Sequence, residues 1–176
     1  MRPFHRKVPR EPLRVLVRHA DAGIRRDWSG LDQWRGRSRL GHGQARELTA
    51  RLDGLPITRV LSSPALRCRQ TVIPLARELS LEVEPCRLLA GDCDPGELIR
   101  LLETAETENA VLCTHRETLL GVFGRFAMGV DGPRLIDGVA RMEMAAAWAM
   151  YGTVGAPTLL RLLRPTDDIS VGVSGR

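Results

Sequence analysis

Short segments typical of buried strands alternate with longer amphipathic segments along most of this chain. Strands are expected at 13–17, 58–61, 82–84 and 110–113. Between and after them, apolar residues recur every three or four positions, as they do on one face of a helix. This alternation favours an α/β fold, a three-layer α/β/α sandwich with a mostly parallel central sheet, in which ligands gather beyond the carboxyl ends of the strands.

The first strand segment leads directly into two polar residues. Leu13–Val17 is a nearly continuous apolar run, the pattern of a strand buried on both faces in a parallel sheet. Arg18 and His19 follow where that strand should end. We therefore expect both side chains at the edge of the sheet where ligands bind.

The helix patterns carry their own start and stop signals. Apolar spacing predicts a helix from Gly41 to Leu55. The segment 64–80 is expected to begin with a capping serine and with Pro64 at its first helical position, and to kink or split at Pro74. Asp94 should cap a later helix. A last helix is expected to follow His115, rich in Leu119, Leu120, Val122, Phe123 and Phe126.

The ends of the chain differ from its middle. Residues 1–12 are basic and contain proline, which indicates a flexible leader, and residues 165–176 are expected to form a flexible tail. The segments 145–151 and 157–163 flank a glycine-containing turn and predict a terminal hairpin. One domain is expected to extend over residues 13–164.

Composition excludes several classes of protein. With 43% hydrophobic and 27% charged residues, the chain is typical of a soluble globular protein. It has no apolar stretch long enough to span a membrane and no pattern of a cleavable signal, so a cytoplasmic location is expected. Its four cysteines form no CxxC pair, so we expect reduced thiols, no metal site and no cofactor.

The positive charge of the chain suggests an anionic partner. The net charge is +5, and part of it comes from the predicted leader. Aromatic residues make up only 4% of the chain, too few for an array of base-stacking side chains. Phosphorylated substrates are therefore favoured as partners over nucleic acid, and no membrane partner is expected.

Three polar clusters fall at or just after predicted strand ends on one face: Arg18-His19, the turn at 62–64 that leads to Arg67, and Thr114-His115. Guanidinium groups bind phosphoryl oxygens in a forked geometry, and imidazole can donate a hydrogen bond or act as a nucleophile. Alone, each residue has an ordinary structural alternative: a hydrogen-bonded histidine, a surface arginine or a helix cap. Together they favour a site for phosphoryl transfer.

These residues resemble the histidine phosphatase, or phosphoglycerate mutase-like, superfamily, and within it the short phosphohistidine phosphatase-like branch. The resemblance extends from about Leu13 to Phe126 and implies the phosphoglycerate mutase-like fold. It rests on four motifs: Arg18-His19-Ala20, Arg35 with the helix opening Gly41 to Gln44-Ala45, the ten residues Ser62 to Thr71, and Leu112 to Glu117.

The resemblance implies a role for each matching residue. His19 would be the phosphorylated nucleophile, while Arg18, Arg67 and His115 would bind the phosphoryl oxygens. The family usually has a glutamate after the third strand that protonates the leaving group, but Ala90 stands at that position here. Asp92 is the nearest replacement, with loop solvation as its equally weighted alternative.

Further departures leave other roles open. Asp94 and Glu97 are weaker replacements for the missing glutamate because the start of a helix needs them. Glu117 is a substitute acid or a residue that orients His115. Arg116 stands where relatives of this branch often have a small residue, and it either adds a phosphate contact or narrows the pocket.

Other polar and aromatic residues carry weaker signals. Trp28 and Trp34 follow the first strand, and a lid over the site competes there with simple packing. His5 and His42 lack the strand-end context and are expected to be solvated.

The sequence therefore predicts a metal-independent phosphatase that forms a phosphohistidine intermediate and acts on a phosphomonoester or on protein phosphohistidine. The alternative is a catalytically weak phosphate-binding module that recognises a phosphorylated partner, because the usual glutamate is missing. A basic nucleic-acid binder is a third and less favoured reading.

Overall fold

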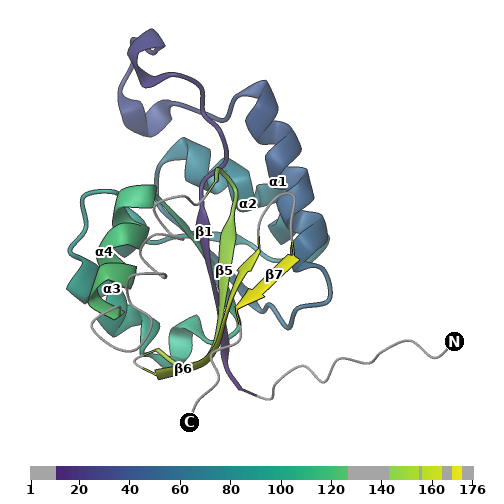
Figure 1. Ribbon diagram of the computed structural model, residues 1–176. Coiled ribbons are helices and arrows are strands. Elements are labelled where there is room, and N and C mark those ends of the chain that lie inside the picture. Colours follow the sequence, from purple (N-terminus) through teal and green to yellow (C-terminus); the bar gives the residue numbers. More distant parts are fainter. Residues whose placement is uncertain (1–10, 127–142, 155, 164–167, 172–176) are drawn as a thin grey trace, which may run out of the picture.

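A seven-stranded sheet lies between two pairs of helices (Figure 1). The structure is a computed structural model that describes residues 11–126, 143–154, 156–163 and 168–171. The strands are β1 (Leu13–Arg18), β2 (Arg59–Ser62), β3 (Val83–Pro85), β4 (Ala110–Thr114), β5 (Ala147–Thr153), β6 (Ala156–Leu163) and β7 (Asp168–Val171). The helices are α1 (Arg39–Leu52), α2 (Leu66–Glu78), α3 (Pro95–Leu102) and α4 (Arg116–Phe126), with short 3-10 helices at Arg25–Asp27, Asp32–Trp34, Arg87–Leu89 and Ala105–Thr107.

The strand order is β3-β2-β4-β1-β5-β6-β7. The first four strands in this order are mutually parallel, and β5, β6 and β7 add an antiparallel half. Strands β1 and β4 are neighbours although about ninety residues separate them, and Arg18 pairs with Thr114. The carboxyl ends of β1, β4 and β2 therefore meet at one edge of the sheet, as the predicted sandwich requires.

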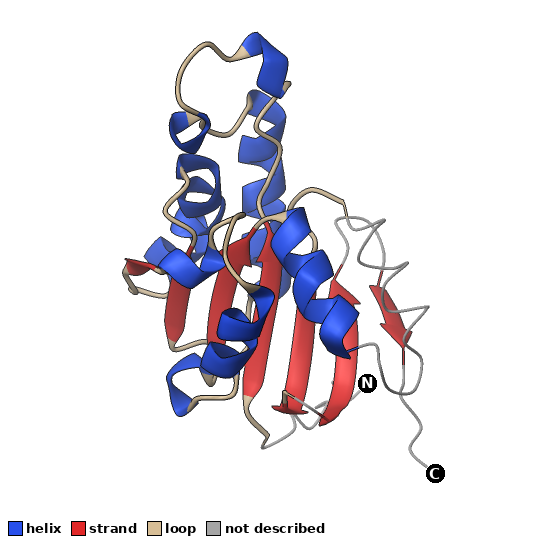
Figure 2. Cartoon of the chain, turned by 90° about the vertical axis from the view of Figure 1, so that its left-hand side faces the viewer, coloured by secondary structure: helices blue, strands red, loops and turns tan. Residues whose placement is uncertain are grey.

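Hydrophobic side chains fill both spaces between sheet and helices. Helices α1 and α2 pack on one face, where Val15 and Val17 of β1 point, and α3 and α4 pack on the other face with Leu16 (Figures 1 and 2). Every residue of β4 is buried. A strand covered on both faces needs apolar residues at successive positions, which explains the nearly continuous runs in the sequence.

Helix α1 begins two residues before the predicted start. The hydroxyl of Ser38 accepts a hydrogen bond from the backbone N–H of Gly41 at 3.1 Å and so caps the helix. Leu55 lies beyond the end of α1, where it packs against the core from a loop. The cap of α3 by Asp94 is confirmed, since its carboxylate accepts from the N–H of Gly96.

The predicted start of α2 is wrong, and the split predicted as one of two outcomes at Pro74 does not occur. The helix begins at Leu66 rather than at Pro64, and Ala65 occupies the cap position without a side-chain hydrogen bond. The hydroxyl of Ser63 instead lies 3.0 Å from the ring of His115. The helix also continues through Pro74 without splitting, because burial of its apolar face outweighs the one backbone hydrogen bond that proline removes.

The carboxyl-terminal hairpin is confirmed as β5 and β6. Residues Asp168–Val171, inside the segment 165–176 predicted as a loose tail, pair with β6 as strand β7, so for these four residues the prediction is wrong. The rest of that segment and residues 1–10 of the predicted leader lie outside the described residues. None of the helices in the described part of the chain is long and apolar enough to cross a membrane.

The segment between β1 and α1 projects from the main body of the fold (Figures 1 and 2). The large hydrophobic side chains that are exposed in the described residues all lie between positions 24 and 40. They are Ile24, Trp28, Leu31, Trp34 and Leu40.

Candidate active site

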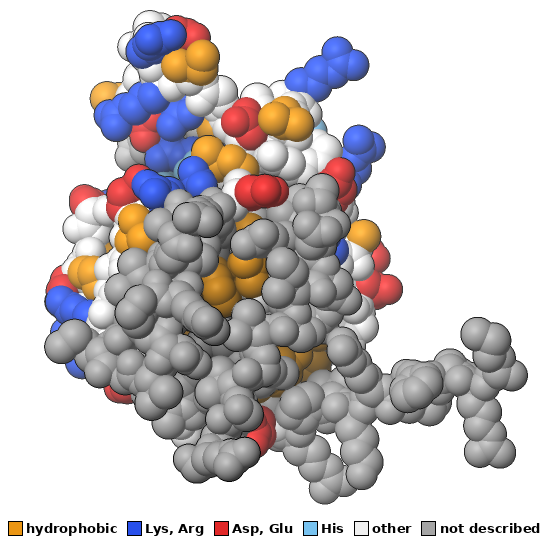
Figure 3. Space-filling model, viewed as in Figure 1, with side chains coloured by type: hydrophobic (Ala, Val, Ile, Leu, Met, Phe, Trp, Pro, Cys, Tyr) orange, Lys and Arg blue, Asp and Glu red, His pale blue; other side chains and the backbone are white. Residues whose placement is uncertain are grey.

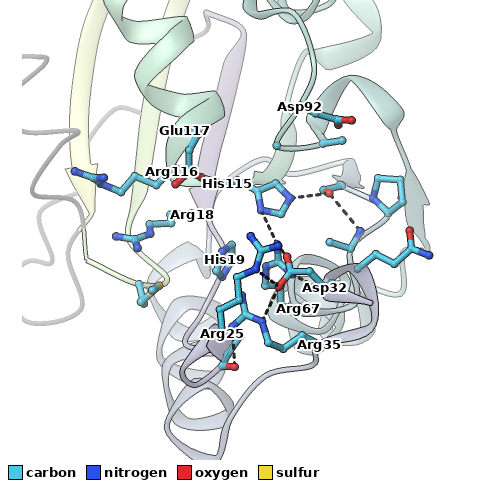
Figure 4. Close-up of a pocket in the computed structure, with 18 of the residues that line it drawn as sticks. Arg18, His19, Arg25, Asp32, Arg35, Arg67, Asp92, His115, Arg116 and Glu117 are labelled. Carbon is cyan, nitrogen blue, oxygen red and sulfur yellow. Dashed lines mark hydrogen bonds and ion pairs between the residues drawn. The ribbon is translucent and has the colours of Figure 1, made fainter. Parts of the chain in front are cut away.

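A cavity of about 710 Å³ opens beyond the carboxyl ends of β1, β2 and β4. All five residues that the sequence predicts for the site line it: Arg18, His19, Arg67, Asp92 and His115 (Figure 4). They come from the end of β1, from α2, from the turn after β3 and from the residue between β4 and α4. The convergence follows from strand order, since β4 lies between β1 and β2.

His19 is held in one tautomer by the backbone. The backbone N–H of His19 donates to the carbonyl of Thr114 at 3.0 Å, and the ring Nδ1 lies 2.8 Å from the carbonyl oxygen of Ala20. A carbonyl can only accept, so Nδ1 carries the proton and Nε2 keeps its lone pair. Burial lowers the pKa of His19 to about 4, with a further lowering from the charges near it, so the ring is neutral at neutral pH.

The chain after His19 is fixed by contacts with both α1 and α2. The N–H of Ala20 donates to the hydroxyl of Thr71 at 2.9 Å, and the N–H of Asp21 donates to the side chain of Gln44 at 2.8 Å. Gly41 packs so closely against the carbonyl oxygen of Asp21 that an added Cβ would overlap with it. The glycine that opens the helix motif therefore lets α1 approach the segment that positions His19.

His115 lies close to His19, with ring centroids 5.4 Å apart in an edge-on arrangement. Its Nδ1 accepts from Nη2 of Arg67 at 3.3 Å, since a guanidinium can only donate. In a neutral ring Nε2 then carries the proton and donates to the hydroxyl of Ser63 at 3.0 Å. Sequence reasoning missed this role of Ser63 because a serine before a helix is also a typical cap.

Two threonines hold the turn after β3 against this histidine. The hydroxyl of Thr114 donates to the carbonyl of Leu89 at 2.6 Å, and that of Thr118 donates to the carbonyl of Ala90 at 3.1 Å. Gly91 then lies over the ring of His115, where an added Cβ would sit 3.5 Å from Cγ. The turn in which Ala90 stands at the position of the family's usual glutamate is therefore part of the cavity wall.

Asp32 is the site residue that sequence reasoning missed. Its carboxylate lies 2.9 Å from Nη2 of Arg67, and its backbone carbonyl accepts from Nη1 at 2.8 Å. Burial alone would raise the pKa of Asp32, but the hydrogen bond from Arg35 and the nearby arginine charges outweigh it and hold that pKa below its usual range. Asp32 is therefore a carboxylate at neutral pH and a poor proton donor. Its place in a polar loop gives no signal in the sequence.

The candidate acids differ in their surroundings. Asp92 lines the cavity but is 71% exposed and lies 3.0 Å from Arg87. Glu117 also lines the cavity from the first turn of α4. Asp94 and Glu97 do not line it, and Asp94 pairs with Arg125 outside the site. Of the three carboxylates among the described residues of the cavity wall, Asp92 and Glu117 thus remain as candidate proton donors, because Asp32 is held as a carboxylate.

Arginines dominate the cavity wall. Among the described residues, six arginines line it against three carboxylates. Arg18 and Arg116 lie on the other side of His19 from Arg67 in Figure 4. Burial lowers the pKa of Arg18, and the positive charge of Arg116 lowers it further, while Glu117 acts in the opposite direction. Figure 3 shows basic side chains gathered on the upper half of the face that it presents, toward the projecting segment between β1 and α1.

Trp28 and Trp34 do not line this cavity. Both line a separate hollow of about 490 Å³ on the projecting segment and are 42% and 56% exposed. They therefore form no lid closed over His19 in this structure, and the ring of Trp28 packs next to Gly30 in its own segment. His42 is exposed on α1, as expected, and His5 lies outside the described residues.

The described residues contain no group of three or more His, Cys, Asp or Glu side chains placed to hold a metal ion. All four cysteines have free thiols, and Cys68 lies 3.5 Å from Nε2 of His115.

Comparison with known proteins gives a consistent picture. Residues 15–97 match the model of the histidine phosphatase superfamily (branch 1). The chain is 33% identical over 113 residues to an 8-oxo-(d)GTP phosphatase of Mycolicibacterium smegmatis, in an alignment that covers 61% of this chain and 35% of that protein. This chain therefore spans only about a third of the length of that curated relative.

Solved structures share the fold. The protein histidine phosphatase SixA complexed with tungstate superposes with a TM-score of 0.70 and 24% identity, covering 87% of this chain and 97% of that one. A candidate phosphohistidine phosphatase SixA from Agrobacterium tumefaciens gives a TM-score of 0.66 and 21% identity, over 92% of this chain and 99% of that one. At these identities the likeness shows the fold.

Proposed function

We propose that this chain is a member of the histidine phosphatase superfamily, whose model its residues 15–97 match, and that it is a metal-independent phosphatase in which His19 accepts the phosphoryl group from the substrate. One observation carries the proposal: a buried, neutral His19 with its Nδ1 proton held by the Ala20 carbonyl lies in one cavity with Arg18, Arg67 and His115. An imidazole in this state is ready to act as a nucleophile.

The reaction proceeds in two displacements at phosphorus. Nε2 of His19 attacks, a P–N bond forms, and the bond to the leaving oxygen breaks as an acid protonates that oxygen. The phosphorylated imidazole is cationic, and the Ala20 carbonyl stabilises its Nδ1–H. Water then attacks phosphorus and loses a proton to the same acid, now a base. The P–N bond breaks, and Nε2 recovers its lone pair.

The groups around His19 stabilise the charge of the transferring phosphoryl group. Arg18 and Arg67 supply guanidinium donors, and His115 supplies its Nε2 proton. That proton is directed at Ser63 in the structure described here. To donate this proton to a phosphoryl oxygen, His115 therefore has to give up its hydrogen bond to Ser63.

Asp92 is our proposed acid. It lines the cavity, it stands two residues after Ala90, and its pair with Arg87 is exposed enough to exchange with solvent. Glu117 is the competing candidate because it lines the same cavity next to His115.

The substrate is a phosphomonoester or protein phosphohistidine. The relatives named above include an 8-oxo-(d)GTP phosphatase and a protein histidine phosphatase, so they do not point to one substrate. The cytoplasmic location and the domain limits 13–164 stay predictions from the sequence.

The test is phosphate release from p-nitrophenyl phosphate, with trapping of an acid-labile phosphohistidine. We expect wild type to turn over the substrate, and His19→Ala to lose activity and the adduct. Arg67→Ala should lose at least about a hundred-fold in kcat/KM, since two charge-assisted hydrogen bonds are removed. Arg69→Ala, an exposed arginine two residues along α2, is the matched control and should retain activity. Equal rates for wild type and His19→Ala would contradict the proposal.

A phosphate-binding module with little turnover is the second candidate. Ala90 at the usual glutamate position and the exposure of Asp92 favour it. It predicts that tungstate binds wild type and not Arg67→Ala, while phosphate release from wild type stays at the level of His19→Ala.

A further inference from the structure

Arg116 lies where a second anion on a bound substrate would be recognised. It is the first residue of α4, it follows His115 directly, and it lines the same cavity. In Figure 4 its side chain extends on the same side of His19 as that of Arg18. Arg67 and Asp32 lie on the other side of His19 in that view. The two arginines therefore extend the basic wall in one direction away from the nucleophile.

Two like charges in one cavity repel each other, and an anion bound between them offsets the free-energy cost of this repulsion. Arg18 and Arg116 line the same cavity and lie on the same side of His19 in Figure 4, and the positive charge of Arg116 lowers the pKa of Arg18. The amino-terminal end of α4 adds a partial positive charge at the same place. Glu117 offsets part of this charge, so an incoming oxyanion also has to compete with one carboxylate.

The cavity has room for more than one phosphoryl group. Its volume of about 710 Å³ falls within the range of sites that enclose whole small molecules. Its six arginines exceed its three carboxylates by three positive charges, which is more than one phosphate dianion neutralises.

We propose that Arg116 provides a second oxyanion subsite next to the phosphoryl site that Arg18 and Arg67 serve, and that the substrate is a phosphorylated small molecule whose leaving group carries a further phosphate or carboxylate. This inference rests on the proposed function for its choice of substrate. It deepens that function by naming the chemical class of the leaving group. A forked guanidinium suits both oxyanions, so the second group is defined by its oxygens.

The test measures binding of three probes that are not hydrolysed. Methylphosphonate carries one oxyanion, phosphonoacetate adds a carboxylate, and methylenediphosphonate adds a second phosphonate. Calorimetry on wild type should show at least one two-anion probe binding about ten-fold more tightly than methylphosphonate, as one added charged hydrogen bond gives. Which of the two probes gains more identifies the second group as carboxylate or phosphate.

Variants assign the gain to Arg116. Arg116→Ala should remove most of the ten-fold preference, and Arg116→Lys should keep part of it. Arg77→Ala, an exposed arginine at the end of α2, should keep all of it. Arg87→Ala removes the same charge from another part of the cavity wall and should reduce the preference less.

Three results would overturn the subsite: equal affinities for all probes, a preference that survives in Arg116→Ala, or an equal loss in Arg87→Ala and Arg116→Ala. The last would mean that the charge of the whole cavity is responsible. Because the probes need no turnover, this outcome is separate from that of the proposed function. Equal phosphate release by wild type and His19→Ala would end the phosphatase proposal and leave the binding preference standing.

Discussion

Asp32 makes a two-point contact with the guanidinium of Arg67 in the cavity wall, through its carboxylate and through its backbone carbonyl. The carboxylate lies 2.9 Å from Nη2, and the backbone carbonyl of Asp32 accepts from Nη1 at 2.8 Å. A phosphoryl group that binds Arg67 at these atoms has to compete with a carboxylate of the chain itself. The backbone contact is independent of the side chain, so charge and position can be separated by substitution.

We predict that Asp32→Asn binds inorganic phosphate about five-fold more tightly than wild type. The asparagine keeps an oxygen for Arg67 and removes the competing charge, a difference of about 1 kcal/mol. Product inhibition by phosphate measures this directly. Asp27→Asn, an exposed position in the same projecting segment, is the control. Weaker inhibition in Asp32→Asn would mean that the carboxylate mainly positions Arg67.

The buried neutral state of His19 predicts a pH dependence of folding stability. Its pKa falls from an ordinary value of 6.5 to about 4, so the unfolded chain binds more protons between these values. Stability is therefore unaffected by this group above pH 6.5 and decreases as the pH falls toward 4, by roughly 3 kcal/mol. We expect His19→Gln to be less sensitive to acid over this window in urea unfolding at pH 7 and pH 4.5. Identical pH slopes for the two proteins would contradict the buried neutral state.

The close approach of Gly41 to Asp21 predicts opposite effects for two glycines of α1. Gly41→Ala should destabilise the protein by about 1–3 kcal/mol, because its Cβ overlaps with a backbone oxygen that cannot move freely. Gly43→Ala has open space around its Cβ and should stabilise the helix by roughly 0.5–1 kcal/mol. Thermal unfolding compares the two. A neutral Gly41→Ala would show that α1 can shift away from the segment after His19.

The role of Asp92 as acid predicts a dependence on the leaving group. Asp92→Asn should lower kcat for an alkyl phosphate by about 10²–10⁴, because an alkoxide needs a proton to leave. The loss for p-nitrophenyl phosphate should be much smaller, since that phenolate leaves unprotonated. Glu117→Gln is the comparison. If Glu117→Gln shows this selective loss and Asp92→Asn does not, the roles of the two acids are reversed.

The site could be located from the sequence because the carboxyl ends of parallel strands meet at one edge of the sheet. Arg18 ends β1, and His19 and His115 directly follow β1 and β4, so the order of the elements along the chain was enough to group them. The motif from Ser62 to Thr71 added Arg67 for the same reason, since β2 is the other neighbour of β4.

Local signals failed where tertiary contacts competed with them. Ser63 has the sequence context of a helix cap, yet its hydroxyl contacts His115. Pro74 predicts a break that burial of α2 prevents. Strand β7 forms against β6 from a segment whose sequence has no clear strand pattern. For Ser63 and for α2 the deciding partners are far away in the chain, whereas β7 pairs with the strand just before it.

The sequence by itself determined the alternation of elements, the sheet between two helical layers and the four residues expected around a phosphoryl group, because periodicity and motif spacing are local properties. Only the tertiary structure decided the tautomer of His19, the contact between Asp32 and Arg67 and the placement of Arg116 on the same side of His19 as Arg18. These depend on distances between loops and on burial, which set hydrogen-bond partners and pKa values and have no counterpart in the order of the residues.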